Sequence, residues 1–348
     1  RVAAAGADVL DLARGNPETG PPGHVVEALQ RAAARPDVHG YAPFRGLAAL
    51  KEAVAERYRT VYGVELDPAR EVAIVPGVKT ALIEFAQVAV ERGGTILLPD
   101  PGYPDYLSAV ALTATREARL PLDASGRPEW DAAATEAGAV YLNYPSNPAA
   151  AAAPDGVFDE AVEFARRTGA WVLHDFAYGD LVFDGRTPHS FLAAEGAREH
   201  GVELFSMSKS YGMAGWRLGF AVGNEELVRR IELLQDHQFA GVFRPLQEAA
   251  VAALTGPQDS VEERRAAYER RRDRVLAVVD GRSEGTFFVW LRLPSGLTAE
   301  QLLAGHGVAL APGEGFGSRG AGHARLSLAV SDELLDRALE RLAAVLSA

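Results

Sequence analysis

The chain has 348 residues, of which 48% are hydrophobic and 24% are charged, ordinary values for a globular protein long enough to form two domains. Its formal net charge of −12 argues against a general binder of nucleic acid or anionic membranes, without excluding a local positive pocket for one phosphate. The absence of cysteine excludes disulfides, thiol catalysis and thiolate metal sites, and it is compatible with the cytoplasm, which is the location we predict. The eight histidines are dispersed, so we expect no metal site.

Hydrophobic periodicity predicts helices over 24–35 and 45–62, followed by a region in which strands and helices alternate. In that region we expect strands at 71–75, 95–98, 139–142, 170–174, 202–205 and 218–222, and helices at 78–89 and 155–167, with an aromatic-rich helix after Gly102. Continuous apolar strands that alternate with amphipathic helices are typical of a mostly parallel sheet covered on both faces.

The pattern changes in the last third of the chain. We expect helices at 224–236, 245–255 and 259–279, a strand at 286–292, short strands near 308–310 and 324–328, and a closing helix at 332–346. This order predicts a second, smaller α+β domain. We therefore expect an N-terminal segment, 1–30, that packs with the small domain, a large domain over 31–240, and the small domain over 241–348.

The stretch from Ser206 to Gly219 places Lys209 between Ser208 and Ser210, with Arg217 eight residues later. A lysine on a tight loop between buried strands can lose hydration, which lowers its pKa and makes it a candidate amine nucleophile. Taken alone, the stretch also fits a surface turn with a solvated lysine.

Other polar residues follow the other strands, at the sheet edge where α/β proteins bind ligands. Gly77-Val78-Lys79 starts a helix whose free N–H groups can hold a phosphate, although an ordinary strand-to-helix turn has the same pattern. Tyr103 can stack on a planar ligand or simply pack, and Asn147 belongs to an Asn-Pro turn. Asp175 ends a buried strand, so it needs a cation from a ligand, an arginine or a helix N-terminus.

One ligand accounts for these positions together. It has a carbonyl for Lys209, a phosphate for Gly77-Val78-Lys79, Ser206 or Ser208 and Arg217, a ring nitrogen for Asp175, a phenolic oxygen for Tyr178 and Asn147, and a flat face for Tyr103. These are the groups of pyridoxal 5′-phosphate (PLP).

The motifs Ser206-x-Ser-Lys209, Gly215-Trp-Arg217-x-Gly219 and Asp175-Phe-Ala-Tyr178 resemble the signatures of class I/II PLP-dependent aminotransferases, and the resemblance covers nearly the whole chain. It implies an α/β PLP-transferase fold of type I, with a mostly parallel seven-stranded sheet between helices and a smaller α+β domain. It also implies Lys209 as the Schiff-base lysine, Ser206 and Arg217 as phosphate ligands, Asp175 on the pyridinium nitrogen, Tyr178 and Asn147 on the phenolic oxygen, and Tyr103 as the stacking aromatic.

The same resemblance implies substrate and subunit contacts. Arg325 resembles the arginine that binds the substrate α-carboxylate, together with Asn147, and Gly15 matches the glycine whose backbone lies beside the substrate. Tyr41, in a Tyr-x-x-x-x-Gly motif, resembles the tyrosine that reaches the phosphate of the neighbouring subunit. We therefore expect a homodimer with shared active sites.

The predicted function is transfer of an amino group between an L-amino acid and a 2-oxo acid, with Lys209 as the base that moves the Cα proton. The stretches 142–145, 172–179 and 233–237 resemble the LL-diaminopimelate-like and methionine-salvage branch. One departure is Ala149-Ala150, where the family has Thr-Gly, because without the glycine the path of this loop is open.

Three alternatives remain at this point. The scaffold also carries β-lyases, decarboxylases and oxidases, and the residues that hold the cofactor barely distinguish them. A non-catalytic sensor domain descended from an aminotransferase is a second alternative, although no basic helix-turn-helix is visible. A nucleotide-binding α/β enzyme without PLP is the third, and the sequence has neither of the two common glycine-rich phosphate motifs in the required place.

Overall fold

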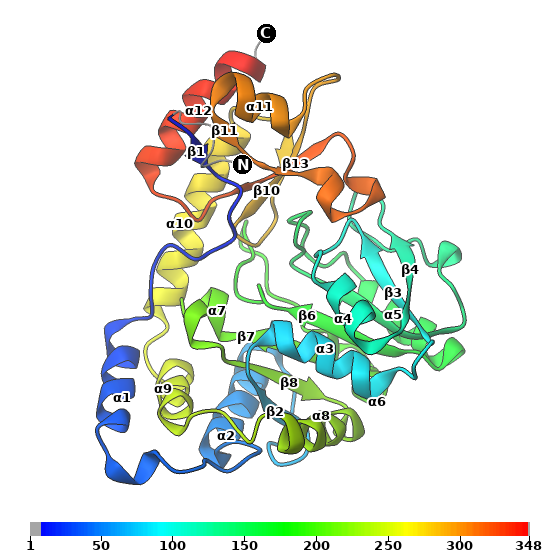
Figure 1. Ribbon diagram of the computed structural model, residues 1–348, viewed down its shortest axis with the longest axis vertical. Coiled ribbons are helices and arrows are strands. Elements are labelled where there is room, and N and C mark those ends of the chain that lie inside the picture. Colours follow the sequence, from blue (N-terminus) through cyan, green and yellow to red (C-terminus); the bar gives the residue numbers. More distant parts are fainter. Residues whose placement is uncertain (1–7, 347–348) are drawn as a thin grey trace.

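The computed structural model describes residues 8–346 and is built around a seven-stranded sheet (Figure 1). The strand order is β2 (Val72–Val75), β8 (Gly219–Gly223), β7 (Gly201–Ser206), β6 (Trp171–Phe176), β5 (Ala137–Asn143), β3 (Thr95–Asp100) and β4 (Arg116–Pro121). Strand β8 runs antiparallel to β2 and β7, whereas the other neighbouring pairs are parallel. The predicted α/β class and mostly parallel sheet are confirmed.

Helices cover both faces of this sheet. One face packs against α3 (Val78–Ala89), α4 (Tyr106–Thr113) and α8 (Glu225–Gln238), and the other against α2 (Ala48–Arg57), α5 (Val157–Thr168), α6 (Ala197–His200) and α9 (Arg244–Thr255). In β5, Tyr141 joins the first of these cores and Val140 and Leu142 join the second. Because successive side chains of a strand point to opposite faces, a strand buried on both sides must be apolar throughout.

A second sheet of four strands lies in the upper part of Figure 1. Its order is β12 (Ala311–Pro312), β13 (His323–Ser327), β10 (Phe288–Arg292) and β9 (Gly281–Arg282), and it shares its core with α10 (Asp259–Leu276), α11 (Ala299–His306) and α12 (Asp332–Leu346). Strand β1 (Leu10–Asp11) pairs in parallel with β11 (Val308–Ala309), which brings the N-terminal segment into this α+β part.

The predicted domain boundaries at residues 30 and 240 stay predictions, and residues 1–7 of the first segment lie outside the described residues. The cores suggest a refinement. Leu12 belongs to the core of the small sheet, whereas Val25 in α1 (Gly23–Ala33) and the neighbouring α9 belong to the core of the large one. Within α10, Val261 joins the large core and Tyr268 the small one. We infer that the chain passes between the cores after β1 and again inside α10.

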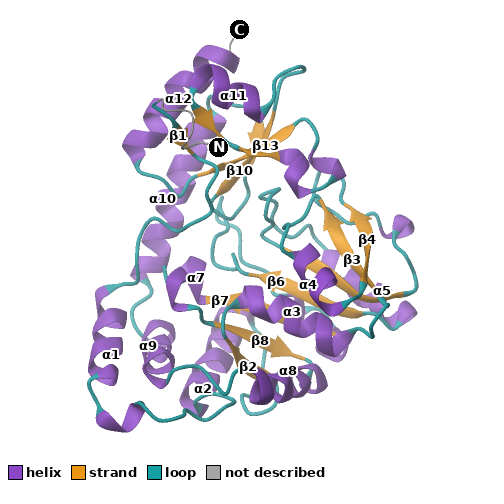
Figure 2. Cartoon of the chain, viewed as in Figure 1, coloured by secondary structure: helices purple, strands orange, loops and turns teal. Residues whose placement is uncertain are grey.

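Two kinds of element escaped the sequence patterns. Strand β4 is an edge strand whose first residues are exposed, so it tolerates the charges of Arg116 and Glu117 that hide its strand character. Lys209 lies not in an open loop but in a short helix, α7 (Met207–Ser210), too brief to show a helical period. Figure 2 shows that the segments lying between the two sheets are mainly loops. Over residues 8–346, no helix combines the length and apolar character needed to cross a bilayer.

Candidate active site

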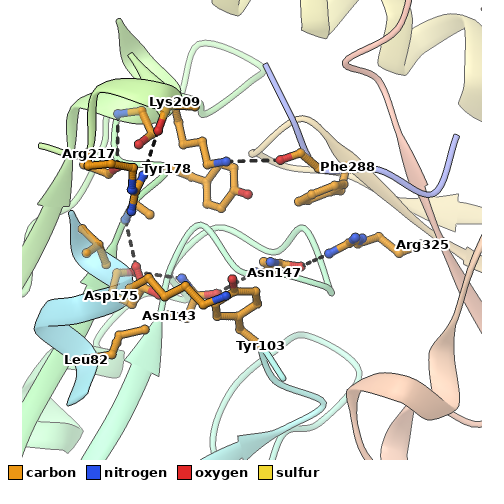
Figure 3. Close-up of a pocket in the computed structure, with 17 residues that line it drawn as sticks. Leu82, Tyr103, Asn143, Asn147, Asp175, Tyr178, Lys209, Arg217, Phe288 and Arg325 are labelled. Atoms are coloured by element: carbon orange, nitrogen blue, oxygen red, sulfur yellow. Dashed lines mark hydrogen bonds between the residues drawn. The ribbon is translucent and has the colours of Figure 1, made fainter. Parts of the chain in front are cut away.

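A cavity of about 440 Å³ lies between the two sheets, at the carboxyl ends of the large sheet's parallel strands (Figure 3). Most of the residues predicted for the site line it: Gly15, Val78, Lys79, Tyr103, Asn147, Asp175, Tyr178, Ser206, Ser208, Lys209, Arg217 and Arg325. Residues from both ends of the chain and from its middle therefore converge on one volume.

Lys209 extends from α7 into this cavity, toward the N-terminal segment (Figure 3). Its Nζ lies 3.3 Å from the carbonyl oxygen of Gly15 and is placed over the rings of Phe287 and Tyr178 at 5.1 and 5.7 Å. A carbonyl and two ring faces hydrate an ammonium less well than water does, so the charged form is disfavoured.

Burial lowers the pKa of Lys209 to about 8. The carboxylate of Asp175 opposes this shift, and the positive charges of Arg217 and Arg325 add to it. A substantial fraction of the amine is therefore neutral at mildly alkaline pH, as a nucleophile or a base requires.

An anion-binding corner lies on one side of Lys209. Arg217 adopts a left-handed backbone conformation with φ 55°, and its Nη1 donates to the carbonyl of Ala214 at 2.8 Å. Ser206 caps α7 by accepting a hydrogen bond from Ser208 N at 3.1 Å, and both serines line the same cavity as Arg217. Together with the first N–H groups of α3, these groups can bind a dianion such as a phosphate.

Gly77 does not itself line the cavity, but it shapes this corner. Its φ is +90°, and a Cβ placed there would lie 2.3 Å from Nη2 of Arg217. A glycine is therefore needed for the guanidinium to lie against the start of α3. Nearby, the side chain of Lys79 pairs with Asp105 (Nζ to Oδ2, 2.8 Å), which leaves its backbone N–H as the group directed at the corner.

Asp175, the fifth residue of β6, is 5% exposed and accepts hydrogen bonds from Tyr106 Oη at 2.8 Å and from Ala177 N at 3.1 Å. Burial raises the pKa of Asp175, and the hydrogen bond from Tyr106 acts in the opposite direction. Among the described residues Asp175 makes no ion pair, so the neighbouring arginine considered from sequence is not its partner. Tyr106 was not predicted as a site residue, because only the packing of α4 brings it here.

Asn143 is a second residue that the sequence interpretation missed. It lies opposite Asp175 in the register of β5 and β6. Its Nδ2 donates to the Asp175 carbonyl at 2.8 Å, and its Oδ1 accepts from Asn147 N at 2.7 Å. Asn143 therefore fixes the loop that carries Asn147, and its place at the end of a strand was a usable signal.

Arg325, in β13, faces the cavity from the small sheet and is 9% exposed. Its Nη1 donates to Oδ1 of Asn147 at 2.6 Å, and its Nη2 donates to the carbonyl of Ala13 at 3.2 Å. Burial lowers the pKa of Arg325. Phe288, also missed from sequence, lines the cavity beside it and contacts Gly15, where an added Cβ would meet the ring at 2.9 Å.

Tyr103 and Tyr178, which were predicted to contact the ring of the cofactor and its phenolic oxygen, lie on opposite walls of the cavity (Figure 3). Burial raises the pKa of Tyr178 and of Tyr103, so both keep their phenolic hydrogens as donors. Tyr103 meets Tyr106 edge to face, with ring centroids 5.5 Å apart. A flat group between Tyr103 and Lys209 would thus have the ring of Tyr103, the carboxylate of Asp175 and the phenol of Tyr178 around it.

Tyr41 is the predicted residue that the cavity does not include. It is 88% exposed and lies outside the cavity of its own chain. Its predicted role in a neighbouring subunit stays a prediction.

The loop after Asn147 keeps its turn without the glycine. Ala150 takes a φ of 50°, in the left-handed region, while Ala150 N donates to Ser146 O and Ser146 N donates to Ala151 O, each at 2.9 Å. The path left open by the sequence is therefore a closed turn, held by two backbone hydrogen bonds despite an alanine in a conformation that favours glycine.

The donors in the cavity fit PLP. The cavity is lined by four kinds of group, each of which matches one group of that cofactor. They are the anion-binding corner at Arg217, the partly neutral amine of Lys209, the buried carboxylate of Asp175, which makes no ion pair within the described residues, and the phenol of Tyr178. Arg325 completes the cavity from the small sheet.

Comparisons with known proteins agree with this geometry. The model of the family "Aminotransferase class I and II" matches residues 7–342. The L-glutamine--4-(methylsulfanyl)-2-oxobutanoate aminotransferase of Bacillus subtilis (strain 168) is 44% identical, over 98% of this chain and 90% of the relative. The LL-diaminopimelate aminotransferase of Moorella thermoacetica is 38% identical, over 98% of this chain and 92% of the relative. The solved structure of substrate-bound BacF from Bacillus subtilis superposes with a TM-score of 0.92 at 38% identity, covering 97% of this chain and 90% of that one.

Proposed function

Because this chain belongs to the class I and II aminotransferase family, whose members are PLP-dependent enzymes, we propose that the cavity around Lys209 is its active site. The enzyme transfers an amino group between an amino acid and a 2-oxo acid. The observation that carries the assignment is the amine of Lys209, with a pKa of about 8, between an anion corner at Arg217 and a carboxylate-binding arginine, Arg325. An amine placed between these two arginines can reach a molecule whose phosphate is bound by Arg217 and whose carboxylate is bound by Arg325.

Each group of PLP has a proposed partner in the cavity. Arg217, Ser206, Ser208 and the N–H groups of Val78 and Lys79 would hold the phosphate, Asp175 the ring nitrogen, Tyr178 and Asn147 the phenolic oxygen, Tyr103 the ring face, and Lys209 the aldehyde carbon. When bound, PLP supplies an electron sink for the negative charge that forms at Cα of the substrate.

The protein's own part in the reaction is orientation and proton movement. Arg325 and Asn147, already joined by a hydrogen bond of 2.6 Å, orient the substrate carboxylate. The substrate Cα–H would then face Lys209, whose neutral amine would take this proton as a base and then, as an acid, give it up at the carbon of the cofactor's aldehyde group. The nearby Gly15 carbonyl, 3.3 Å from Nζ, accepts a hydrogen bond from the amine and limits its range.

The test is removal of the amine. Replacing Lys209→Ala should lower the rate of amino-group transfer by at least about 100-fold, the range of a lost general base. Added primary amines should restore part of that rate, and more so for amines of higher pKa. Turnover of the variant at the wild-type rate, or a variant that added amines do not help, would sink the assignment.

The substrate is a second question. The names of two relatives, L-glutamine--4-(methylsulfanyl)-2-oxobutanoate aminotransferase and LL-diaminopimelate aminotransferase, support L-glutamine and LL-diaminopimelate as the first donors to test and 4-(methylsulfanyl)-2-oxobutanoate as the first acceptor. A panel of L-amino acids with several 2-oxo acids, followed through the absorbance of the cofactor, identifies the pair. Assays for pyruvate with ammonia, for carbon dioxide and for peroxide in the same samples separate transamination from lyase, decarboxylase and oxidase reactions.

We also propose a homodimer with shared active sites. The supporting feature is an aromatic patch of Tyr41, Phe44, Phe239 and Phe243, whose side chains are 88%, 44%, 44% and 45% exposed. The patch is formed by two segments, 39–44 and 239–243, which lie in contact. The rings of Phe243 and His39 stack with centroids 6.3 Å apart, and a Cβ at Gly241 would lie 3.2 Å from Cα of Phe44. Gathered exposed aromatics are common at protein interfaces. The cytoplasmic location is likewise a proposal, supported by the cysteine-free composition.

A further inference from the structure

The guanidinium of Arg325 lies over two phenylalanine rings. Its Cζ is 4.0 Å from the ring centroid of Phe288 and 4.8 Å from that of Phe316. Both rings are buried, with 1% and 7% of their surface exposed. A cation over an aromatic face is attracted by the ring quadrupole, and the attraction grows when water is excluded. Two such contacts hold the plane of the guanidinium as well as its position.

The edge of the same guanidinium is only partly used. Nη1 donates to Asn147 and Nη2 to the carbonyl of Ala13, whereas the buried Nε has no hydrogen-bond partner within residues 8–346. Among the described residues no carboxylate pairs with Arg325. A buried donor without a partner is costly, and a buried cation without an anion is costlier. The side chain is thus held ready for an anion that the described chain does not provide.

Phe316 reaches this position through a contact between the two sheets. It lies in the segment Gly313–Gly320, whose next residues bind the end of β3: Ser318 Oγ donates to Asp100 Oδ2 at 2.6 Å, and Arg319 N donates to Asp100 Oδ1 at 3.0 Å. In addition, Gly102 N donates to the carbonyl of Phe316 at 2.8 Å. Asp100 is 2% exposed and does not line the cavity.

The fit of this contact is close. Gly317 has a φ of +132°, and a Cβ there would lie 2.2 Å from Oδ1 of Asp100. The segment therefore turns directly over the carboxylate, and its backbone has little freedom while that carboxylate is present. Removing the carboxylate would release the turn that places the Phe316 ring beside Arg325.

We propose that Phe288 and Phe316 are positioning residues that orient Arg325 for a carboxylate, and that Asp100 positions Phe316. This inference rests on the proposed function, in which Arg325 binds the substrate α-carboxylate. It assigns the preference for substrates with a carboxylate not to the arginine alone but to an arginine held by two rings and one remote aspartate. Truncating either ring keeps the arginine in the sequence but allows its guanidinium to change orientation and to become hydrated.

The test compares two compounds of the same shape in the holoenzyme: 4-(methylsulfanyl)butanoate, which carries a carboxylate, and 4-(methylsulfanyl)butanamide, which is neutral. Titration calorimetry gives the Kd of each. In Phe316→Leu and Asp100→Ala, the Kd of the carboxylate should rise by roughly tenfold, as for the loss of one desolvated cation–π contact, while the Kd of the amide stays within about twofold. For the amino-acid substrate, KM should rise and kcat should change little.

The variants have matched controls. Phe183→Leu removes a buried ring from Arg272, which lies over it at 5.1 Å outside the cavity, and Asp123→Ala removes a turn carboxylate that accepts from Ser125 N at 2.7 Å. Both should leave the ratio of the two Kd values unchanged. Phe316→Tyr keeps the ring and Asp100→Asn keeps an acceptor, so each should retain a ratio near that of the wild type.

The outcomes are distinct. If carboxylate and amide weaken equally in Phe316→Leu and Asp100→Ala, these residues act only on general packing and the inference is overturned. If Arg325→Met also leaves the ratio unchanged, the proposed role of Arg325 fails and the inference fails with it. If Arg325→Met abolishes the preference for the carboxylate while Phe316→Leu and Asp100→Ala retain it, the proposed function stands and only the inference is wrong.

Discussion

At the scale of single residues, the environment of Lys209 sets its chemistry. Burial removes water from the amine, Asp175 supplies a negative charge that favours the ammonium, and Arg217 and Arg325 supply positive charges that oppose it. Because these effects have known signs, each one can be reversed separately by a substitution.

The pKa of Lys209 is the first prediction. In the cofactor-free enzyme, the rate at which this amine reacts with an acylating reagent should increase with pH. The midpoint should lie near pH 8, well below the ordinary lysine pKa of 10.5. Asp175→Asn removes the charge that raises the pKa, so the midpoint should fall; Arg217→Met removes a charge that lowers it, so the midpoint should rise. The chain has only three lysines, so mass spectrometry can follow Lys209 with Lys51 and Lys79 as internal references. A midpoint near 10.5 in the folded protein would contradict the assigned environment.

Asn143 is the subject of the second prediction. Asn143→Ala removes the hydrogen bonds that this side chain makes with Asn147 N and the Asp175 carbonyl, so the free energy of unfolding should fall by about 2–4 kcal/mol and KM for the amino acid should rise as Asn147 moves. Urea unfolding and steady-state kinetics measure both effects. The control is Asn224→Ala, which removes the N-cap of α8, should cost ~1 kcal/mol and should leave KM unchanged. An Asn143→Ala enzyme with wild-type stability would refute this account.

At the scale of elements, the centre of the large sheet depends on a buried polar cluster. Glu203 in β7 is fully buried and binds Tyr58 Oη at 2.7 Å, Ser190 Oγ at 3.0 Å and His174 Nδ1 at 2.7 Å. The other ring nitrogen of His174 meets the carbonyl of Tyr144 at 3.0 Å. This cluster joins β6 and β7 to the segments that carry Tyr58, Tyr144 and Ser190, and none of its members lines the cavity, so it matters for the fold and not directly for the chemistry.

The third prediction concerns this cluster. Glu203→Gln should lower the free energy of unfolding by roughly 3–5 kcal/mol, because an amide cannot replace the carboxylate as acceptor for all of the buried hydrogen bonds from Tyr58 and Ser190 and for the contact with His174. Glu117→Gln, in the exposed part of edge strand β4, should change it by less than about 0.5 kcal/mol. Denaturant unfolding of the two variants provides the comparison. Equal stability of the two would show that the cluster is not important for the fold.

The sequence predicted those elements whose pattern is local. Strands β6 and β7 are mostly apolar because both faces are covered, and Asp175 and Lys209 stand out because they lie at or just after the ends of these strands. Tyr106, Phe288 and Phe316 could not be predicted as site residues in the same way. Each looks like an ordinary core aromatic, and only the packing of distant elements brings it to Asp175 or Arg325. The charged edge strand β4 was missed because exposure removes the apolar signal.

At the scale of the whole molecule, the cavity depends on two cores that meet at the Asp100 contact and along the N-terminal segment. The residues of β1 pair with β11 in the small part, and a few residues later Gly15 reaches the amine of Lys209 in the large part. The relative placement of the cores therefore determines the width of the site.

The fourth prediction concerns association of subunits. The double substitution Phe44→Asp and Phe243→Asp places two charges in the aromatic patch and should convert the proposed homodimer to monomers, with loss of activity because Tyr41 would no longer reach a neighbouring site. Sedimentation velocity measures the change. Leu112→Asp, at a residue 66% exposed on α4, should leave the mass and the activity unchanged. A wild-type protein that sediments as a monomer while fully active would refute the shared site.

The antiparallel course of β8 has one more consequence. Because Ser206 pairs with Gly219 across β7 and β8, the connection that carries Lys209 and Arg217 begins and ends at one fixed register. Adding or deleting a residue there would shift the amine against the anion corner, so the length of this connection cannot vary while the reaction is kept. The segment Gly313–Gly320 is restricted in the same way, because it connects β12 and β13, in which Pro312 pairs with Ala324. The groups proposed for proton movement and the ring proposed to orient the substrate carboxylate thus lie on two connections of fixed length, one in each sheet.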